Sequence, residues 1–220
     1  MKGTFTKTFD TAGEYTFYAE KAGSGRSWNQ RVIVCERTAE NDGKPFGILT
    51  NGVTTAGTKS ITWLTQIDDS AAKAQVKYST DAELNGAATV DGTSAIQTFV
   101  QSTRGDALRS NKVTLTNLAP DTTYYYQVGD GATWSNTQSF KMPAADAVAT
   151  NFFILGDIQT GDTANLAAAL EKLKAESYDF GVQTGDAIDN VTMYETHCRP
   201  FLNAVNSGTL GGVPVSLPAM

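Results

Sequence analysis

The hydrophobic pattern of this 220-residue chain changes near residue 144, and this change constrains the fold more than any other feature. Before it, short segments alternate apolar and polar side chains and are separated by turn residues, as antiparallel strands are. After it, Asn151–Leu155 is a continuous apolar run, which is typical of a strand buried on both faces, and Tyr178–Gln183 is apolar again. Between these runs, Thr163–Ala175 carries Leu and Ala at helical spacing. The sequence therefore predicts a β part followed by an α/β part.

Residues 46–143 have the pattern of an immunoglobulin-like sandwich, which needs about seven short strands over roughly 100 residues. The predicted strands are Ser60–Thr65, Ala74–Tyr78, Ile96–Val100, Lys112–Thr116, Thr123–Val128 and Gln138–Lys141. Tyr124 follows Pro120 and Asp121 and fits the corner tyrosine of such sandwiches. The hydroxyl of a corner tyrosine hydrogen-bonds to the backbone a few residues upstream.

Residues 1–36 carry three further strand patterns, at Thr4–Phe9, Glu14–Tyr18 and Gln30–Cys35. The Gly-rich stretch between the last two, residues 22–25, predicts a hairpin turn, because it lacks the Gly-Lys-Ser/Thr ending of a phosphate-binding loop. Three strands are too few to close a sandwich, so we expect residues 1–36 to be the C-terminal remnant of a preceding β domain. The polar residues 37–45 predict a linker.

Residues 144–220 predict one βαβ unit, in which a helix joins two parallel strands. Asp162 is the expected N-cap of that helix. A less regular helix is expected at Val191–Val205, and Val213–Leu217 has the pattern of a third strand.

The net charge of −6 lies entirely in residues 144–220, where nine acidic side chains accompany three basic ones. Such a segment is a poor nucleic-acid surface, because neutralising phosphates requires clustered Lys and Arg. The surplus carboxylates suit cation binding, or form an ordinary solvated surface. No apolar run approaches the ~18 residues of a membrane span, and no apolar signal segment follows Met1. Cys35 and Cys198 are too few for a disulfide framework, and the single histidine, His197, excludes chemistry that needs several imidazoles from these residues.

Each apolar run of the α/β part ends in Gly-Asp, at Gly156-Asp157 and at Gly185-Asp186. Ligands of open α/β sheets bind beyond the carboxyl ends of the strands, and parallel neighbours lie ~4.8 Å apart. The two carboxylates are therefore expected close together, where their repulsion is costly unless a proton or a cation intervenes. This pattern indicates a metal site, and the alternative is a pair of ordinary turn or helix-cap residues.

The two segments that contain these aspartates resemble the first two blocks of the calcineurin-like metallophosphoesterases. They read Phe153-Ile154-Leu155-Gly156-Asp157-Ile158-Gln159 and Gly185-Asp186-Ala187-Ile188-Asp189-Asn190. The preceding fibronectin type III-like module, residues 46–143, resembles the N-terminal domain of purple acid phosphatases. The implied fold is an immunoglobulin/fibronectin III-like sandwich followed by the first βαβ portion of a metallophosphoesterase α/β sandwich.

The resemblance implies a centre of two divalent metal ions, with Fe, Mn, Zn or Mg as candidates. Asp157 would bind one ion and Asp186 would bridge both, while Gln159 stands where the family usually has a histidine ligand. Asp189 stands where purple acid phosphatases have the tyrosine that gives their colour, so the resemblance implies a non-purple relative. Asp189 and Asn190 are expected to support the ligands or to cap a helix.

The function implied by this resemblance is metal-dependent hydrolysis of small-molecule phosphoesters by the full-length protein. The family's third block is expected after Val213–Leu217, so the chain is expected to be the N-terminal part of a catalytic domain, inactive alone and joined to further domains of the same polypeptide. The presence of a fibronectin type III-like domain beside the α/β part implies an extracellular or cell-surface location. The alternatives are an extracellular binding or adhesion protein with a degenerate phosphoesterase domain, or a single structural cation at the Gly-Asp pair.

Overall fold

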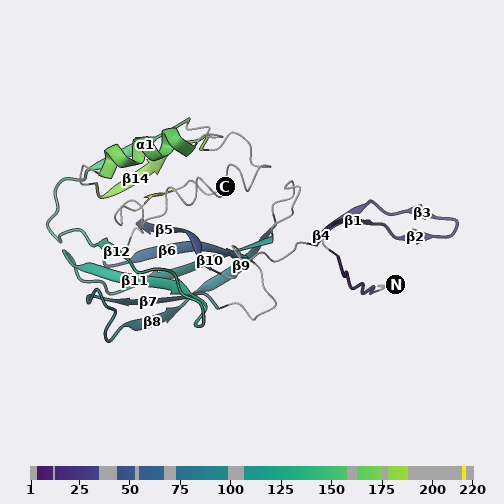
Figure 1. The fold of residues 1–220 in the computed structure, drawn as a ribbon, viewed down its shortest axis with the longest axis horizontal. Coiled ribbons are helices and arrows are strands. Elements are labelled where there is room, and N and C mark those ends of the chain that lie inside the picture. The colour runs from purple at the N-terminus through teal and green to yellow at the C-terminus, as the bar shows by residue number, and fades with distance from the viewer. Residues whose placement is uncertain are drawn as a thin grey trace.

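The computed structural model describes residues 4–11, 13–34, 44–52, 55–66, 73–98, 107–157, 163–174, 178–187 and 215–216. These residues form a two-stranded N-terminal ribbon, a β-sandwich and a small parallel sheet with one helix on it (Figure 1). The ribbon extends away from the sandwich to the right, and the parallel sheet with its helix lies above the sandwich, on the side of β5 (Figure 1). Within the described part of the chain, no helix has the length and hydropathy of a membrane span.

The sandwich consists of two four-stranded antiparallel sheets. One sheet has the order β5 (Phe46–Gly52), β6 (Lys59–Gln66), β10 (Ala107–Leu115) and β9 (Thr93–Thr98). The other has the order β12 (Gln138–Lys141), β11 (Thr123–Gly129), β7 (Gln75–Ser79) and β8 (Ala88–Asp91). In chain order this is the ABED and GFC arrangement of immunoglobulin domains with one added strand beside C. All six predicted strands are present, and β5 and β8 complete the two sheets.

Side chains that alternate along the strands fill the space between the two sheets. Ile61 and Trp63 of β6 face Tyr126 and Val128 of β11 in one buried cluster, and none of the four is more than 1% exposed. Burying a side chain of this size contributes about 1.5–3 kcal/mol. The predicted shared face of Ile61 and Trp63 is therefore confirmed, and this cluster makes the sandwich the stable body of the molecule.

Tyr124 is a corner tyrosine, as its position in the sequence predicts. Its hydroxyl accepts a hydrogen bond from the Ala119 backbone N–H at 2.9 Å, and the residue is buried. Its ring stacks on Phe140 of the neighbouring strand with centroids 5.7 Å apart. The bond closes the turn that leads from β10 into β11, so one side chain fixes both the turn and the core beneath it.

The N-terminal ribbon pairs β1 (Gly13–Phe17) with β4 (Gln30–Val34) and β2 (Glu20–Lys21) with β3 (Gly25–Arg26), both antiparallel. The hairpin turn predicted at residues 22–25 is confirmed. The strand predicted at Thr4–Phe9 is wrong, because residues 4–11 contain no strand. Phe9 instead packs its ring against Tyr15 and Phe17, at 4.4 and 5.6 Å, so aromatic contacts rather than a hydrogen-bond ladder hold this segment to β1.

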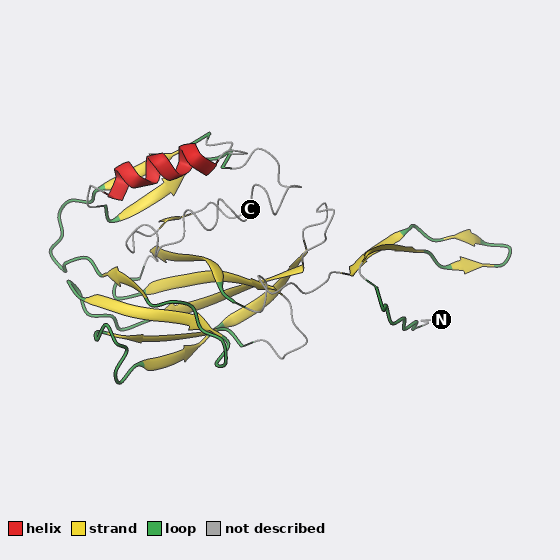
Figure 2. Ribbon diagram, in the orientation of Figure 1, coloured by secondary structure: helices red, strands yellow, loops and turns green. Residues whose placement is uncertain are grey.

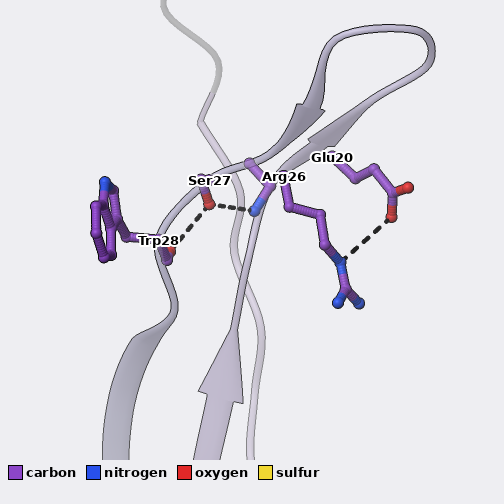
Figure 3. Close-up of polar contacts among 5 residues, drawn as sticks. Glu20, Arg26, Ser27 and Trp28 are labelled. Atoms are coloured by element: carbon purple, nitrogen blue, oxygen red, sulfur yellow. Dashed lines mark hydrogen bonds and ion pairs between the residues drawn. The ribbon is translucent and has the colours of Figure 1, made fainter.

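Polar contacts organise the β2–β3 hairpin (Figure 3). Arg26 Nε lies 3.8 Å from a Glu20 carboxylate oxygen, and the Arg26 guanidinium lies 3.6 Å from the centroid of the Tyr18 ring. Ser27 Oγ accepts a bond from the Ala19 N–H at 2.8 Å and donates to the Trp28 carbonyl at 3.0 Å. Because these groups are exposed, each contact contributes little stability, and they mainly set the shape of the hairpin.

The α/β part contains β13 (Phe152–Leu155), α1 (Thr163–Lys174), β14 (Phe180–Gln183) and β15 (Val215–Ser216). The strands pair in parallel in the order β13-β14-β15, so the predicted strand–helix–strand unit and its third strand are confirmed. Helix α1 lies over one face of this sheet (Figure 2). The helix predicted at Val191–Val205 and the N-cap residue Asp162 lie outside the described residues.

The prediction that the first strand of this sheet is buried on both faces is wrong. Phe153 is buried, but Phe152 and Ile154 are 49% and 60% exposed. Burial on both faces requires a covering layer on each side, and α1 provides one for a single face only. On the buried side, the Phe153 ring occupies the space beside Gly181, where an added Cβ atom would lie 2.2 Å from the ring. This pair packs the two strands tightly against each other.

We predict that Tyr124→Phe lowers the free energy of unfolding of the sandwich by about 0.5–1.5 kcal/mol, because it removes the hydrogen bond between the Ala119 N–H and the hydroxyl of the buried Tyr124. Urea denaturation of the chain measures this. Tyr125→Phe, on the other face of β11, is the control and should change stability by less than about 0.5 kcal/mol. Equal stabilities of the two variants would contradict a structural role for the corner bond.

Candidate metal centre at the strand ends

The hydrogen-bond ladder between β13 and β14 continues beyond both strands to the two Gly-Asp dipeptides. The last paired residues are Leu155 and Gln183. Past them, the Thr184 N–H donates to the Leu155 carbonyl at 2.9 Å, and the Asp157 N–H donates to the Gly185 carbonyl at 3.1 Å. Asp157 is therefore bonded to the residue that directly precedes Asp186, and the two aspartates lie on neighbouring turns.

Both aspartates have the same uncommon backbone conformation. Asp157 has φ of +48° and Asp186 has φ of +46°, in the left-handed region. Non-glycine residues seldom adopt this region, although aspartate tolerates it better than most. Such conformations cost on the order of 1–3 kcal/mol and cluster at functional sites. The matching backbone conformation indicates that the two turns together form one site at this edge of the sheet.

The Gln183 side chain holds the Gly185-Asp186 turn in place, and the sequence did not predict this role. The side chain is buried, with 4% exposure. Its Nε2 donates to the Gly185 carbonyl at 2.8 Å, and its Oε1 accepts the Thr184 N–H at 3.1 Å. The Gly185 carbonyl thus receives bonds from both Gln183 and Asp157. A polar residue at the end of an apolar strand was the signal that could have identified it.

The close approach of the two turns depends on Gly156. A Cβ atom added there would lie 2.6 Å from Thr184 Oγ1. That hydroxyl is also placed 3.4 Å from the Leu155 carbonyl. Glycine therefore leaves the room that Thr184 needs to sit against the end of β13, which keeps the second turn beside the first.

The donor set at these turns suits a hard divalent cation. The Asp157 and Asp186 residues are exposed at the carboxyl end of the sheet, and carboxylate oxygens are ligands that Mg²⁺, Mn²⁺, Fe and Zn²⁺ accept. Two carboxylates on neighbouring turns also lower the cost of placing a cation between them. Among the described residues, no group of three or more His, Cys, Asp or Glu side chains is arranged to hold a metal ion. The described part of the chain therefore contributes these two carboxylates as candidate ligands.

The other predicted site residues lie outside the described residues. These are Gln159, Asp189 and Asn190, and the same holds for His197. Their roles stay predictions.

Comparison with known proteins bears on the sandwich most directly. Residues 45–142 match the family model described as purple acid phosphatase, N-terminal domain. The predicted resemblance of this domain is therefore confirmed. A comparison with curated proteins finds no match for the chain.

Two solved structures have a similar fold. One is the purple acid phosphatase PPD1 from yellow lupin (Lupinus luteus) seeds, with a TM-score of 0.59 and 14% identity over 94% of this chain. The other is PhoD, with a TM-score of 0.56 and 14% identity over 80% of this chain. The chain spans 40% of the first protein's length and 39% of the second's. At this identity the likeness shows the fold.

We predict that Gln183→Met, which keeps the side-chain length but removes both hydrogen bonds, lowers the free energy of unfolding by about 1–3 kcal/mol. Hydrogen exchange of the Thr184 amide should also accelerate, because this N–H loses one of its two acceptors and keeps only the Leu155 carbonyl. Chemical denaturation and NMR measure the two effects. Gln127→Met, which removes one exposed side-chain bond to Thr137, is the matched control and should change stability by less than about 0.5 kcal/mol. A variant at Gln183 that behaves like this control would contradict the anchoring role.

Proposed function

We propose that the full-length protein is a metal-dependent phosphoester hydrolase, a phosphatase or phosphodiesterase that acts on small molecules. The observation that carries the proposal is the pair of strand-end aspartates. They occupy matching left-handed turns, linked by the Asp157 N–H to Gly185 carbonyl bond, in a segment that follows a purple acid phosphatase N-terminal domain.

In this proposal Asp157 would hold one of two divalent ions and Asp186 would be shared by both. Gln159 contributes a neutral amide oxygen, and Asp189 and Asn190 orient the ligands. Divalent ions held by these residues would supply charge that stabilises the phosphoryl group and would lower the pKa of a bound water. The contribution of the chain is to hold two carboxylates at fixed positions, and the Gln183 side chain maintains the turn that carries Asp186.

The comparison with the lupin purple acid phosphatase supports the proposal without extending to substrate. The likeness to the lupin purple acid phosphatase covers 94% of this chain, which is more than the sandwich alone. The chain nevertheless spans only 40% of that protein's length, so the activity is proposed for the full-length protein. We also propose an extracellular or cell-surface location, because a fibronectin type III-like domain accompanies the α/β part.

A second candidate function is a binding or adhesion protein that carries a degenerate phosphoesterase domain. The observation that favours it is a set of three exposed aromatic side chains within residues 4–34. Phe5 and Trp28 are 77% and 90% exposed, and Tyr18 is 45% exposed. Tyr and Trp, which combine an apolar ring with a polar group, are enriched at interfaces.

The test is a phosphatase assay of the full-length protein with a generic aryl phosphate. We predict that Asp157→Asn and Asp186→Asn each lower kcat/KM by at least about 100-fold, because the charge stabilisation that depends on bound metal is worth several kcal/mol. Dialysis against a chelator should abolish turnover, and added Mn²⁺ should restore it.

The matched control is Asp146→Asn, which removes an exposed carboxylate from the segment between the sandwich and the parallel sheet and should leave kcat/KM unchanged. Full metal-dependent turnover by Asp186→Asn would exclude its bridging role. The absence of any turnover in the metal-loaded full-length protein would favour the binding protein.

A further inference from the structure

A cavity of about 460 Å³ lies at the other end of the parallel strands from the aspartates. Phe180, which begins β14, lines it, whereas Gln183 ends that strand beside the Gly-Asp turn. At ~3.3 Å per residue, the three steps from Phe180 to Gln183 separate the two places by roughly 10 Å. The cavity is therefore distinct from the candidate metal centre. Its lining comes from the sandwich, the connecting segment and the parallel sheet: Asn51, Gly52, Lys59, Pro143, Ala144, Ala147, Ala149, Thr150, Asp179 and Phe180.

Lys59 is the cation of this cavity. It begins β6 and is 7% exposed, which is uncommon for a lysine. Its ammonium lies 5.5 Å from the centroid of the Phe140 ring. Burial lowers the pKa of Lys59, and the Asp179 carboxylate opposes this by raising the same pKa. No ion pair joins Lys59 to a carboxylate among the described residues. A buried ammonium in this position gains from an anion brought into contact with it.

Asp179 is the anion of this cavity and comes from the other part of the chain. One of its carboxylate oxygens accepts the Asn151 N–H at 2.8 Å, and its own N–H donates to the Asn151 carbonyl at 2.8 Å. These two bonds hold the carboxylate just before β14. The sandwich therefore supplies a positive charge and the parallel sheet a negative charge to the same cavity.

Most of the remaining wall is apolar, and Asn51 and Thr150 are its uncharged polar residues. Pro143, Ala144, Ala147 and Ala149 belong to the connecting segment, where all four are exposed, so the cavity opens to solvent on that side. The volume falls within the ~300–1,000 Å³ that small-molecule sites have, and such sites combine apolar walls with a few polar groups that orient the ligand.

We propose that this cavity binds a small zwitterion with an apolar body, such as a free aliphatic α-amino acid. The carboxylate of the ligand pairs with the Lys59 ammonium, its ammonium group pairs with the Asp179 carboxylate, and its side chain lies against the alanines of the connecting segment. A simple anion satisfies Lys59 but is repelled by Asp179, and a simple cation has the reverse difficulty. The site does not depend on the proposed hydrolase activity.

Calorimetric titration of the 220-residue chain with L-leucine tests the proposal. The matched probes are 4-methylpentanoate, which lacks the ammonium group, and isopentylamine, which lacks the carboxylate. We predict that L-leucine binds at least about 10-fold more tightly than either probe, which corresponds to about 1.4 kcal/mol.

The variants separate the two charged contacts. Lys59→Met should weaken the binding of L-leucine until its affinity equals that of isopentylamine for the unchanged chain. Asp179→Asn should weaken the binding of L-leucine until its affinity equals that of 4-methylpentanoate for the unchanged chain. Asn at position 179 can still accept the Asn151 N–H, so this variant keeps the local backbone bond and remains informative if Lys59→Met does not fold. Lys112→Met, which removes an exposed lysine of β10, is the control and should leave the affinity unchanged.

Three results would overturn the proposal. The first is no detectable binding of L-leucine at millimolar concentration. The second is equal binding of L-leucine and its two single-charge probes. The third is L-leucine affinity that neither Asp179→Asn nor a folded Lys59→Met changes.

Discussion

Parallel pairing of β13 with β14 is the interaction on which the candidate site depends. Parallel neighbours run in the same direction at a spacing of ~4.8 Å, so residues at equal distances past the strand ends come together. The backbone bond from Asp157 to Gly185 extends this pairing into the turns. Because the two aspartates stand in the same left-handed conformation, the neighbouring turns present the same residue type at the same step of the chain.

The strain of these turns is balanced by contacts that lie beneath them. Left-handed conformations of non-glycine residues persist only where the surroundings over-determine them. Here the buried Gln183 amide bonds both sides of the second turn, and Gly156 leaves Thr184 the room to pack against the first. The turns therefore stay in place before any ligand binds, which reduces the reorganisation that a cation would otherwise require.

The two ends of the small parallel sheet have different chemistry. The carboxyl end carries exposed aspartates that suit a hard cation, whereas the amino end faces a cavity with a largely apolar wall and one charge of each sign. The sandwich contributes to the second end through Lys59, and its core, closed by the Tyr124 corner bond, provides the rigid wall from which that lysine projects. The sandwich, which matches the family model of the purple acid phosphatase N-terminal domain, thus supplies one of the two charges of the cavity.

The sequence by itself determined the elements whose signals are local. Alternation at Ile61 and Trp63, the turn before Tyr124, the helical spacing in α1 and the repeated Gly-Asp are all visible within a few residues, and the corresponding strands, corner bond, helix and neighbouring turns are present. Tertiary structure decided what depends on distant segments. Phe152 and Ile154 are exposed because the described helix covers one face of the sheet. Thr4–Phe9 forms no strand and instead has aromatic contacts in place of a hydrogen-bonding partner. The roles of Gln183 and Lys59 depend on groups that lie near them only in the folded chain. The hydrophobic periodicity of a segment predicts whether it forms a helix or a strand and which face is apolar. Its burial and its strand pairing depend on the distant segments that folding brings beside it.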